Sequence, residues 1–155
     1  MSVLVRLKSM GITLPEVAAP VANYVPAVVH DRIVTISGQL PRRNGMVIVG
    51  QVGADLDVEE GQEAARLCGI AILATLANTL GGDLDQVERC LQLNGFVSAP
   101  VSFTDHPTVI NGASDLMVEV FGENGRHARA AVGCSSLPLG AAVEVAATFA
   151  LKSPR

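Results

Sequence analysis

Aromatic side chains are scarce in this chain of 155 residues, which has no Trp, one Tyr and four Phe. Its formal net charge at pH 7 is −4. Proteins that stack on bases need aromatic rings, and proteins that bind phosphate backbones need a basic surface. The composition therefore argues against nucleic acid as a partner, and the acidic balance offers nothing to an anionic membrane surface.

Cysteine motifs and long apolar runs are also missing. Cys68, Cys90 and Cys134 are widely spaced and form no CxxC or Cys/His ligand pattern, so neither a disulfide framework nor a zinc site is predicted. The N-terminus lacks the apolar core of a signal peptide, and the most apolar run, residues 64–80, is shorter than a membrane span. We expect a cytoplasmic protein with no membrane partner.

Apolar residues, by contrast, are abundant: 49% of the chain is hydrophobic and only 17% is charged. A chain of this length can bury a real core as one domain, and no repeat or long linker divides it. We predict a single domain over residues 1–155, in which residues 1–20 form an N-terminal helix and the start of an extended connection, residues 13–22. The apolar excess also predicts a subunit interface.

Capping signals place three helices. Ser2 opens a short one that Gly11 ends, and the box of Asp57 and Glu60 opens a long one that runs to about Leu80. Residues 104–107 open another long helix, which ends at Gly122. Strands are predicted over residues 23–29 (an edge strand, because of Pro26), 32–37, 46–49 and 87–96, with two more after residue 128. This order favours an α+β fold: a mixed sheet with both long helices packed on one face.

Residues 129–151 read as a hairpin, because Pro138 and Gly140 signal a turn. A register with Ser136 opposite Ala141 sends alternate side chains to two faces. One is an ordinary core face: Ala130, Val132, Cys134, Val143, Val145 and Phe149. The other consists of small side chains around two charges: Arg129, Ala131, Gly133, Ser135, Ala142, Glu144, Ala146 and Thr148.

Arg129 and Glu144 are the charges that need an explanation, because a charge on such a surface must be solvated, paired or used. In the predicted hairpin they lie roughly 13 Å apart, at about 3.3 Å per residue. One interpretation is rim charges or a structural ion pair. The other is that the two side chains converge across a subunit boundary. Asn111-Gly112 within the second long helix is a further oddity, because both residues lower helix propensity. Either packing tolerates a local irregularity, or Asn111 faces a site and Gly112 permits a close approach.

Five segments together resemble a known family. They are residues 23–25, 36–41, 109–111 and 128–130, and residues 137–138 followed by 143–145. In this order and spacing they are similar to the Rid family, the reactive intermediate deaminases, which are also called the YjgF or L-PSP endoribonuclease family. The resemblance covers nearly the whole chain after about residue 20. The N-terminal helix and the longer loops indicate a divergent subgroup.

The resemblance implies a chorismate-mutase-like α+β fold that assembles as a homotrimer with sites between subunits. It implies hydrolysis of 2-imino acids to 2-oxo acids and ammonia, with a small imino or keto acid as partner and no metal or organic cofactor. Arg129 matches the residue that binds the substrate carboxylate, and Glu144 the residue that activates water. Tyr24, Ser37 and Asn111 match residues that line the cleft. Ala131 stands where the family often has Cys, and a role through its main chain is compatible with Ala.

Two alternatives remain open. The second interpretation, after the deaminase, is a trimeric protein that binds a small carboxylate through Arg129 without turnover. Ribonuclease activity is attached to the family by name, but the acidic balance and the few aromatic residues argue against it.

Overall fold

A five-stranded mixed sheet forms one layer of the computed structural model, which describes residues 1–20 and 22–154. The strand order is β1-β2-β7-β5-β6. β6 runs parallel to β5, and the other neighbours are antiparallel. The strands are β1 (Ala27–His30), β2 (Ile33–Gln39), β5 (Val87–Ser98), β6 (Ala128–Cys134) and β7 (Val143–Leu151). Two short strands, β3 (Arg42–Arg43) and β4 (Met46–Val47), pair beside the sheet.

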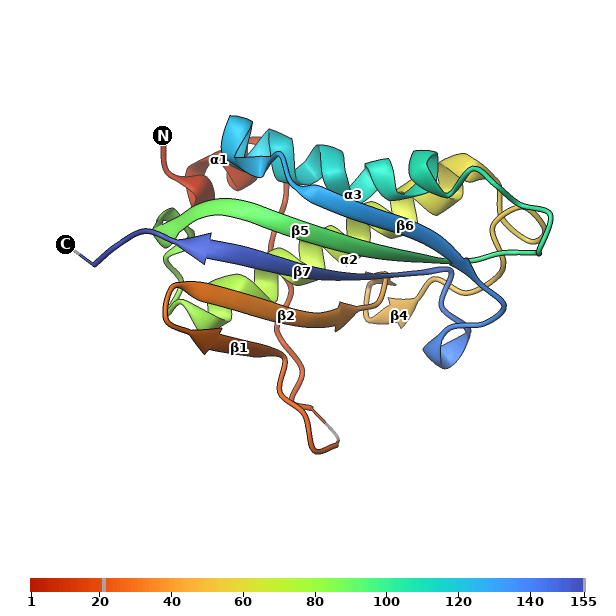
Figure 1. The fold of residues 1–155 in the computed structure, drawn as a ribbon, viewed down its shortest axis with the longest axis horizontal. Helices are drawn as coiled ribbons and strands as arrows, with labels where there is room; N and C mark the ends of the chain where they lie inside the picture. Colours follow the sequence, from red (N-terminus) through yellow and green to blue (C-terminus); the bar gives the residue numbers. More distant parts are fainter. Residues whose placement is uncertain (21, 155) are drawn as a thin grey trace.

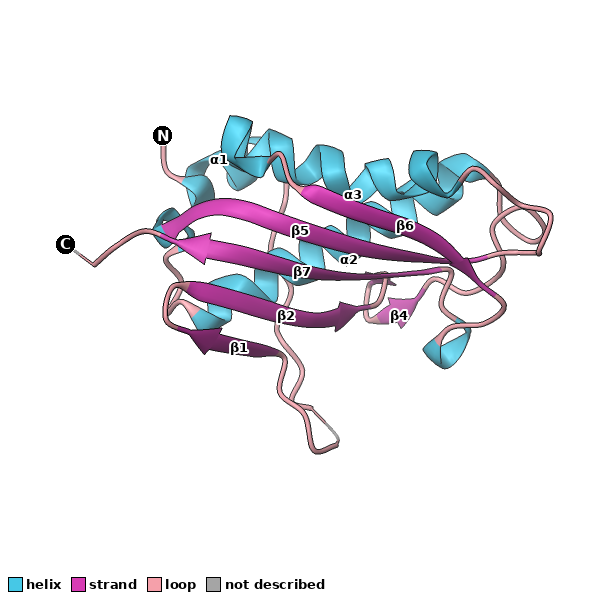
Figure 2. Ribbon diagram, viewed as in Figure 1, coloured by secondary structure: helices cyan, strands magenta, loops and turns pink. Residues whose placement is uncertain are grey.

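Helices form the second layer. In Figure 1 the sheet is viewed from the face that the helices do not cover, and α2 passes behind the strands. The helices are α1 (Val3–Ser9), α2 (Val58–Thr79) and α3 (His106–Phe121). Figure 2 separates the two layers by colour. Short 3-10 turns are η1 (Leu84–Gln86), η2 (Gly122–Gly125) and η3 (Pro138–Gly140). The predicted mixed α+β sheet with both long helices on one face is confirmed.

Local signals set the helix boundaries. The Asp57 carboxylate accepts from the Glu60 N–H, and the Glu60 carboxylate accepts from the Asp57 N–H, which completes the capping box of α2. Ser2 caps α1, and the Arg6 guanidinium donates to the Val120 carbonyl near the end of α3. Residues 12–20 contain no helix or strand, and Val21, inside the predicted connection of 13–22, lies outside the described residues.

Gly112 allows α2 and α3 to pack closely. A Cβ atom at this position would overlap the Gln62 carbonyl oxygen of α2. The low helix propensity of Gly112 is thus offset by a close contact between helix backbones. Between these helices and the sheet lies the core, which includes Phe149, Leu93, Ile110, Leu73 and Leu116, all fully buried.

The predicted C-terminal hairpin is wrong. β5 lies between β6 and β7 and pairs with both, so residues 135–142 form a crossover rather than a tight turn. The crossover is held by the segment before α2: the Gly50 N–H donates to the Gly140 carbonyl, and the Ala142 N–H donates to the Ile48 carbonyl. The Pro/Gly signal at 138–140 correctly marks a change of direction, but that signal is the same for a hairpin and for a crossover.

The position of β5 between β6 and β7 also changes which face of the sheet the predicted side chains occupy. Arg129 pairs with buried Leu93, so Arg129, Ala131 and Gly133 point toward the helices. Glu144 pairs with Phe96 on the opposite face, which we call the open face. The predicted core positions on β7 are correct, since Val143, Val145 and Phe149 are buried. The predicted core positions on β6 are wrong: Ala130, Val132 and Cys134 share the open face.

No helix in the described part of the chain is long and apolar enough to cross a membrane.

Candidate functional site

Arg129 is held against α3 by two hydrogen bonds. Its Nη1 donates to Asn111 Oδ1 at 2.8 Å and to Ser114 Oγ at 3.1 Å. Both bonds use Nη1, and among residues 1–20 and 22–154 the structure gives the Nε and Nη2 groups no protein partner. An exposed guanidinium that is oriented at one nitrogen, with its other edge open, is suited to bidentate binding of a carboxylate.

Ala131 lies two residues along β6 on the same face as Arg129. It pairs with Gly95 of β5, is partly buried and packs against the hydrophobic core. β6 is an edge strand, so its outer backbone N–H and C=O groups have no strand partner within the sheet. Asn111, Arg129 and Ala131 therefore form one group, at the edge of the sheet beside α3.

Glu144 belongs to a second group on the open face. Its carboxyl lies against Gly38, where an added Cβ atom would stand 2.9 Å from Glu144 Cδ. Gly38 follows Ser37 in an irregular stretch of β2, where the pairing with β7 shifts register. Ser37 Oγ donates to the Val25 carbonyl at 2.7 Å, which ties the residue after Tyr24 to β2. Tyr24 itself is exposed.

Partial burial raises the pKa of the Glu144 carboxyl above its ordinary 4.5, because the charged form loses hydration. Within the described residues, no hydrogen bond or ion pair to this carboxylate is present. A partly buried carboxylate with a raised pKa is a stronger base than an exposed one, which suits proton transfer to and from water.

The two groups lie apart within one chain. Arg129 pairs with Leu93 and Glu144 with Phe96, so they are three positions apart along the sheet, with β5 between them. This corresponds to about 10 Å along the strands and about 10 Å across them. Their side chains also point to opposite faces. The structure thus brings Asn111, Arg129 and Ala131 together, and separately Ser37 and Glu144 with the Tyr24 segment, but does not join the groups in one chain.

Two residues beside Arg129, Ser114 and His127, were not predicted from the sequence as part of the site. Ser114 Oγ lies 2.9 Å from His127 Nε2, and His127 Nδ1 lies 2.6 Å from the Gly125 carbonyl oxygen. One signal was available: Asn111 and Ser114 are three residues apart, and such residues share a helix face.

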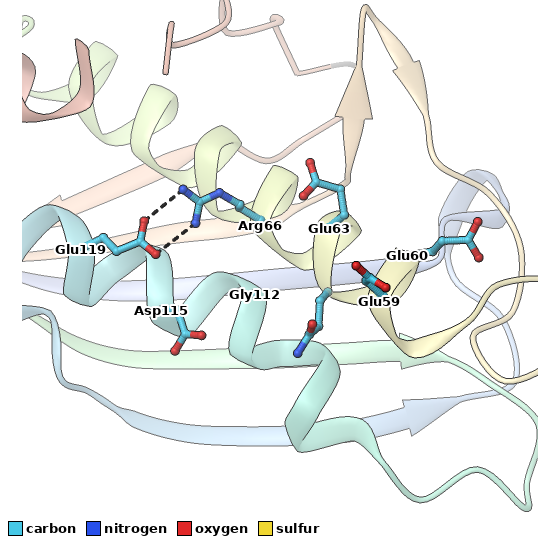
Figure 3. Close-up of a pocket in the computed structure, with 8 residues that line it drawn as sticks. Glu59, Glu60, Glu63, Arg66, Gly112, Asp115 and Glu119 are labelled. Carbon is cyan, nitrogen blue, oxygen red and sulfur yellow. Dashed lines mark hydrogen bonds and ion pairs between the residues drawn. The ribbon is translucent and has the colours of Figure 1, made fainter. Parts of the chain in front are cut away.

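A separate hollow lies away from both groups. It is an open groove of about 520 Å³ between the outer faces of α2 and α3, shown in Figure 3. One guanidinium, Arg66, lines it and pairs with Glu119 at 3.0 Å. Five carboxylates also line the groove: Glu59, Glu60, Glu63, Asp115 and Glu119. This excess of negative charge disfavours an anionic ligand. Among the described residues, no group of three or more His, Cys, Asp or Glu side chains is arranged to hold a metal ion.

Comparison with known proteins gives close relatives over nearly the full length. The chain is 49% identical to Protein TCP17 of Trypanosoma cruzi over 153 residues, which cover 97% of this chain and 95% of that protein. The crystal structure of Atu1372 from Agrobacterium tumefaciens, of unknown function, matches with a TM-score of 0.90 and 46% identity, over 97% of this chain and 92% of that one.

A solved structure described as a putative endoribonuclease from Shewanella oneidensis MR-1 matches with a TM-score of 0.93 and 36% identity, over 97% of this chain and all of that one. The family profile described as "YjgF/chorismate mutase-like, putative endoribonuclease" matches residues 4–150. With a matching profile across almost the whole chain and relatives of this similarity, the protein belongs to the YjgF/chorismate-mutase-like family, to which the Rid and L-PSP proteins also belong.

Proposed function

We propose that the protein hydrolyses reactive 2-imino acids to 2-oxo acids and ammonia, at sites shared between the subunits of a homotrimer. The observation that carries the proposal is the guanidinium of Arg129, oriented by Asn111 and Ser114 with its Nε–Nη2 edge open. A 2-imino acid presents a carboxylate next to its C=N carbon. Binding that carboxylate fixes the position of the reacting carbon.

Glu144 supplies the proton transfers in this proposal. Its carboxylate accepts a proton from water as the water oxygen bonds to the imine carbon. It returns that proton to the imine nitrogen, which becomes an amino group on the carbon that now carries the hydroxyl. The carboxylate then takes the hydroxyl proton and passes it to the amino nitrogen, so that the C–N bond breaks, ammonia leaves and the 2-oxo acid remains. The raised pKa of Glu144 supports this role, because a base is most effective when its pKa is not far below the working pH.

A second copy of the chain is needed because Arg129 and Glu144 point to opposite faces. A substrate of a few heavy atoms cannot span that separation around the sheet edge. The open face also carries exposed apolar side chains: Val28, Ile33 and Val132. Packing another subunit on this face would bury them and bring a second sheet edge, with its own Arg129, toward Glu144.

A second candidate is a protein that binds a small carboxylate without turnover. The same open edge of Arg129 supports it, and only the aim of Glu144 at a water distinguishes the two functions. The description of the Shewanella relative as a putative endoribonuclease suggests a third activity. The net charge of −4 and the shortage of aromatic residues weigh against that activity for this chain.

The test is ammonia release from an imino acid generated in situ by an amino-acid oxidase. Free imines hydrolyse unaided, so the measured quantity is the excess over a protein-free reaction. We expect an excess with the wild type and none with Arg129→Ala. The matched control is Arg32→Ala. It removes a guanidinium in the turn between β1 and β2 that pairs at 3.6 Å with Glu88 of β5.

Each variant should elute as one species of about 48 kDa, three times 16.1 kDa, before its activity is compared. Wild-type protein of that mass could bind 2-oxobutyrate but release no excess ammonia from any of several imino acids. That result would favour the second candidate, a protein that binds a small carboxylate without turnover. An excess that survives Arg129→Ala would show that the substrate carboxylate is bound elsewhere.

A further inference from the structure

A continuous chain of hydrogen bonds links Arg129 to the turn that precedes β6. Arg129 Nη1 bonds to Ser114 Oγ at 3.1 Å, Ser114 Oγ to His127 Nε2 at 2.9 Å, and His127 Nδ1 to the Gly125 carbonyl at 2.6 Å. The Gly125 end of this series of hydrogen bonds is closely packed. Gly125 is buried in η2, and a Cβ atom there would overlap the Met117 carbonyl of α3.

The chemistry of the end groups fixes the direction of every bond. A carbonyl oxygen only accepts, so His127 Nδ1 carries the proton that binds Gly125. In the neutral imidazole, Nε2 is then an acceptor and takes the hydroxyl proton of Ser114. With its single proton committed to His127, the Ser114 oxygen presents its lone pairs to the Arg129 N–H. Neutral His127 therefore orients Ser114 as an acceptor for Arg129.

Charges around His127 oppose its protonation. Arg129 of β6 lies at the other side of the shared hydroxyl, and Arg89 of β5 and His127 line a second hollow, at the start of β6. Cys90 of β5 lines it also, and burial raises the pKa of that thiol to about 12, so it remains uncharged. In η2 and just after it, the Glu123 carboxylate pairs with Arg126 at 3.1 Å. Burial is the main reason that the pKa of His127 is lowered from 6.5; the bond to the Gly125 carbonyl acts in the opposite direction, and the Arg129 charge adds to the lowering.

We infer that His127 and Ser114 are positioning residues for Arg129: the neutral imidazole, acting through the serine hydroxyl, holds the guanidinium in the orientation that binds a substrate carboxylate. A proton on Nε2 would turn this acceptor into a donor. The Ser114 oxygen would then face donors from two cations, and its own proton would need another acceptor. Acidification therefore releases Arg129 from Ser114 and leaves Asn111 as its remaining partner. The role of Arg129 rests on the proposed function, whereas the hydrogen-bond chain does not.

This inference predicts a change in affinity rather than in the chemical step. Ser114→Ala removes one hydrogen bond to a charged group and should weaken binding of 2-oxobutyrate about tenfold, while kcat changes little. His127→Gln keeps an acceptor in place of Nε2 and cannot titrate, so its affinity at neutral pH should lie within about threefold of wild type. The control is His30→Gln, because His30 is exposed at the end of β1.

The first measurement is the dissociation constant of 2-oxobutyrate by calorimetry from about pH 8 down to about pH 5, where histidine titrates. Affinity of the wild type and of His30→Gln should fall as the pH drops through the pKa of His127. Affinity of His127→Gln and of Ser114→Ala should not follow that titration. A purely structural role would weaken binding equally at every pH, so parallel profiles in all four proteins would overturn the inference.

The second measurement needs neither turnover nor ligand. Nitrogen-15 NMR of the imidazole should show His127 in the Nδ1–H tautomer at neutral pH, and the Arg129 guanidinium signals should shift with the titration of His127. In Ser114→Ala the Arg129 shift should be lost while His127 still titrates. The Nε2–H tautomer, or an Arg129 signal that ignores His127 in the wild type, would overturn the inference. Absence of ammonia release would count against the deaminase proposal alone and leave this result decisive.

Discussion

Arg129 and Glu144 belong to the same sheet but point to opposite faces of it, because β5 lies between their strands and shifts them three positions apart. Asn111 and Ser114 fix the first residue against α3, and the second lies over Gly38. The Arg129 guanidinium and the Glu144 carboxylate do not pair with each other. The proposed reaction, which uses these two side chains together, therefore draws them from two copies of the chain.

Gly112→Ala should destabilise the protein. The new methyl group would overlap the Gln62 carbonyl of α2 and force the two long helices apart. Overpacking of this kind costs about 1–3 kcal/mol, a loss of roughly 3–10 °C in Tm for a domain of this size. Thermal unfolding followed by circular dichroism measures the change.

The matched control is Gly69→Ala in α2. Its new Cβ would meet the end of the Leu116 side chain at 2.9 Å, which can rotate away, and the nearest backbone atom is 3.6 Å distant. The gain in helix propensity, about 1 kcal/mol, offsets this contact. Equal Tm values for the two variants would contradict the close approach of the helix backbones at Gly112.

Sequence signals located the elements well where their causes are local. The carboxylates of Asp57 and Glu60 and the proline at position 107 act within one helical turn, so the beginnings of α2 and α3 could be predicted. The strand order could not. Whether residues 135–142 return directly or cross over β5 depends on which strand fills the gap, and no residue in the turn determines that.

The candidate site was predictable only through its resemblance to the family. Arg129 and Glu144 were singled out as charges among small residues, but on one face, and that error follows from the wrong strand order. The contact between Ser114 and His127 could not be predicted, because it depends on how η2 packs against α3. Such tertiary contacts leave no pattern within either segment.

Glu144→Gln should stabilise the protein at neutral pH. Burial raises the pKa of Glu144 in the folded state above 4.5, so the charged carboxylate opposes folding. The favourable contribution of the neutral carboxyl is complete below the unfolded pKa and is lost as the pH rises through the folded pKa. We expect a higher Tm than wild type at neutral pH and equal values in acid.

Scanning calorimetry across the pH range tests this. Glu16→Gln, at an exposed carboxylate in the segment after α1, provides the comparison. A Glu144→Gln variant that is less stable than wild type at neutral pH would mean that the carboxylate has a favourable partner in the assembled protein.

Ser37→Ala should impair the reaction more than it impairs folding. The hydroxyl ties the Val25 carbonyl, next to Tyr24, to β2 on an exposed surface. Its loss should cost no more than about 1 kcal/mol of stability, whereas a displaced Tyr24 segment should lower kcat/KM about tenfold, the equivalent of 1.4 kcal/mol. Ser153→Ala, which removes another exposed hydroxyl bonded to a distant residue, Arg32, is the control. Loss of Tm without loss of kcat/KM would contradict a role for this segment in the cleft.

Subunit complementation would show whether Arg129 and Glu144 act together from neighbouring chains. Arg129→Ala and Glu144→Gln chains are each expected to be inactive in ammonia release. Unfolded and refolded together in equal amounts, they should form mixed oligomers in which about one quarter of the sites combine an intact Arg129 with an intact Glu144 from the neighbouring chain. We expect about one quarter of wild-type activity to be recovered. No recovery, in mixtures shown by mass spectrometry to contain both chains in one oligomer, would contradict a site shared between subunits.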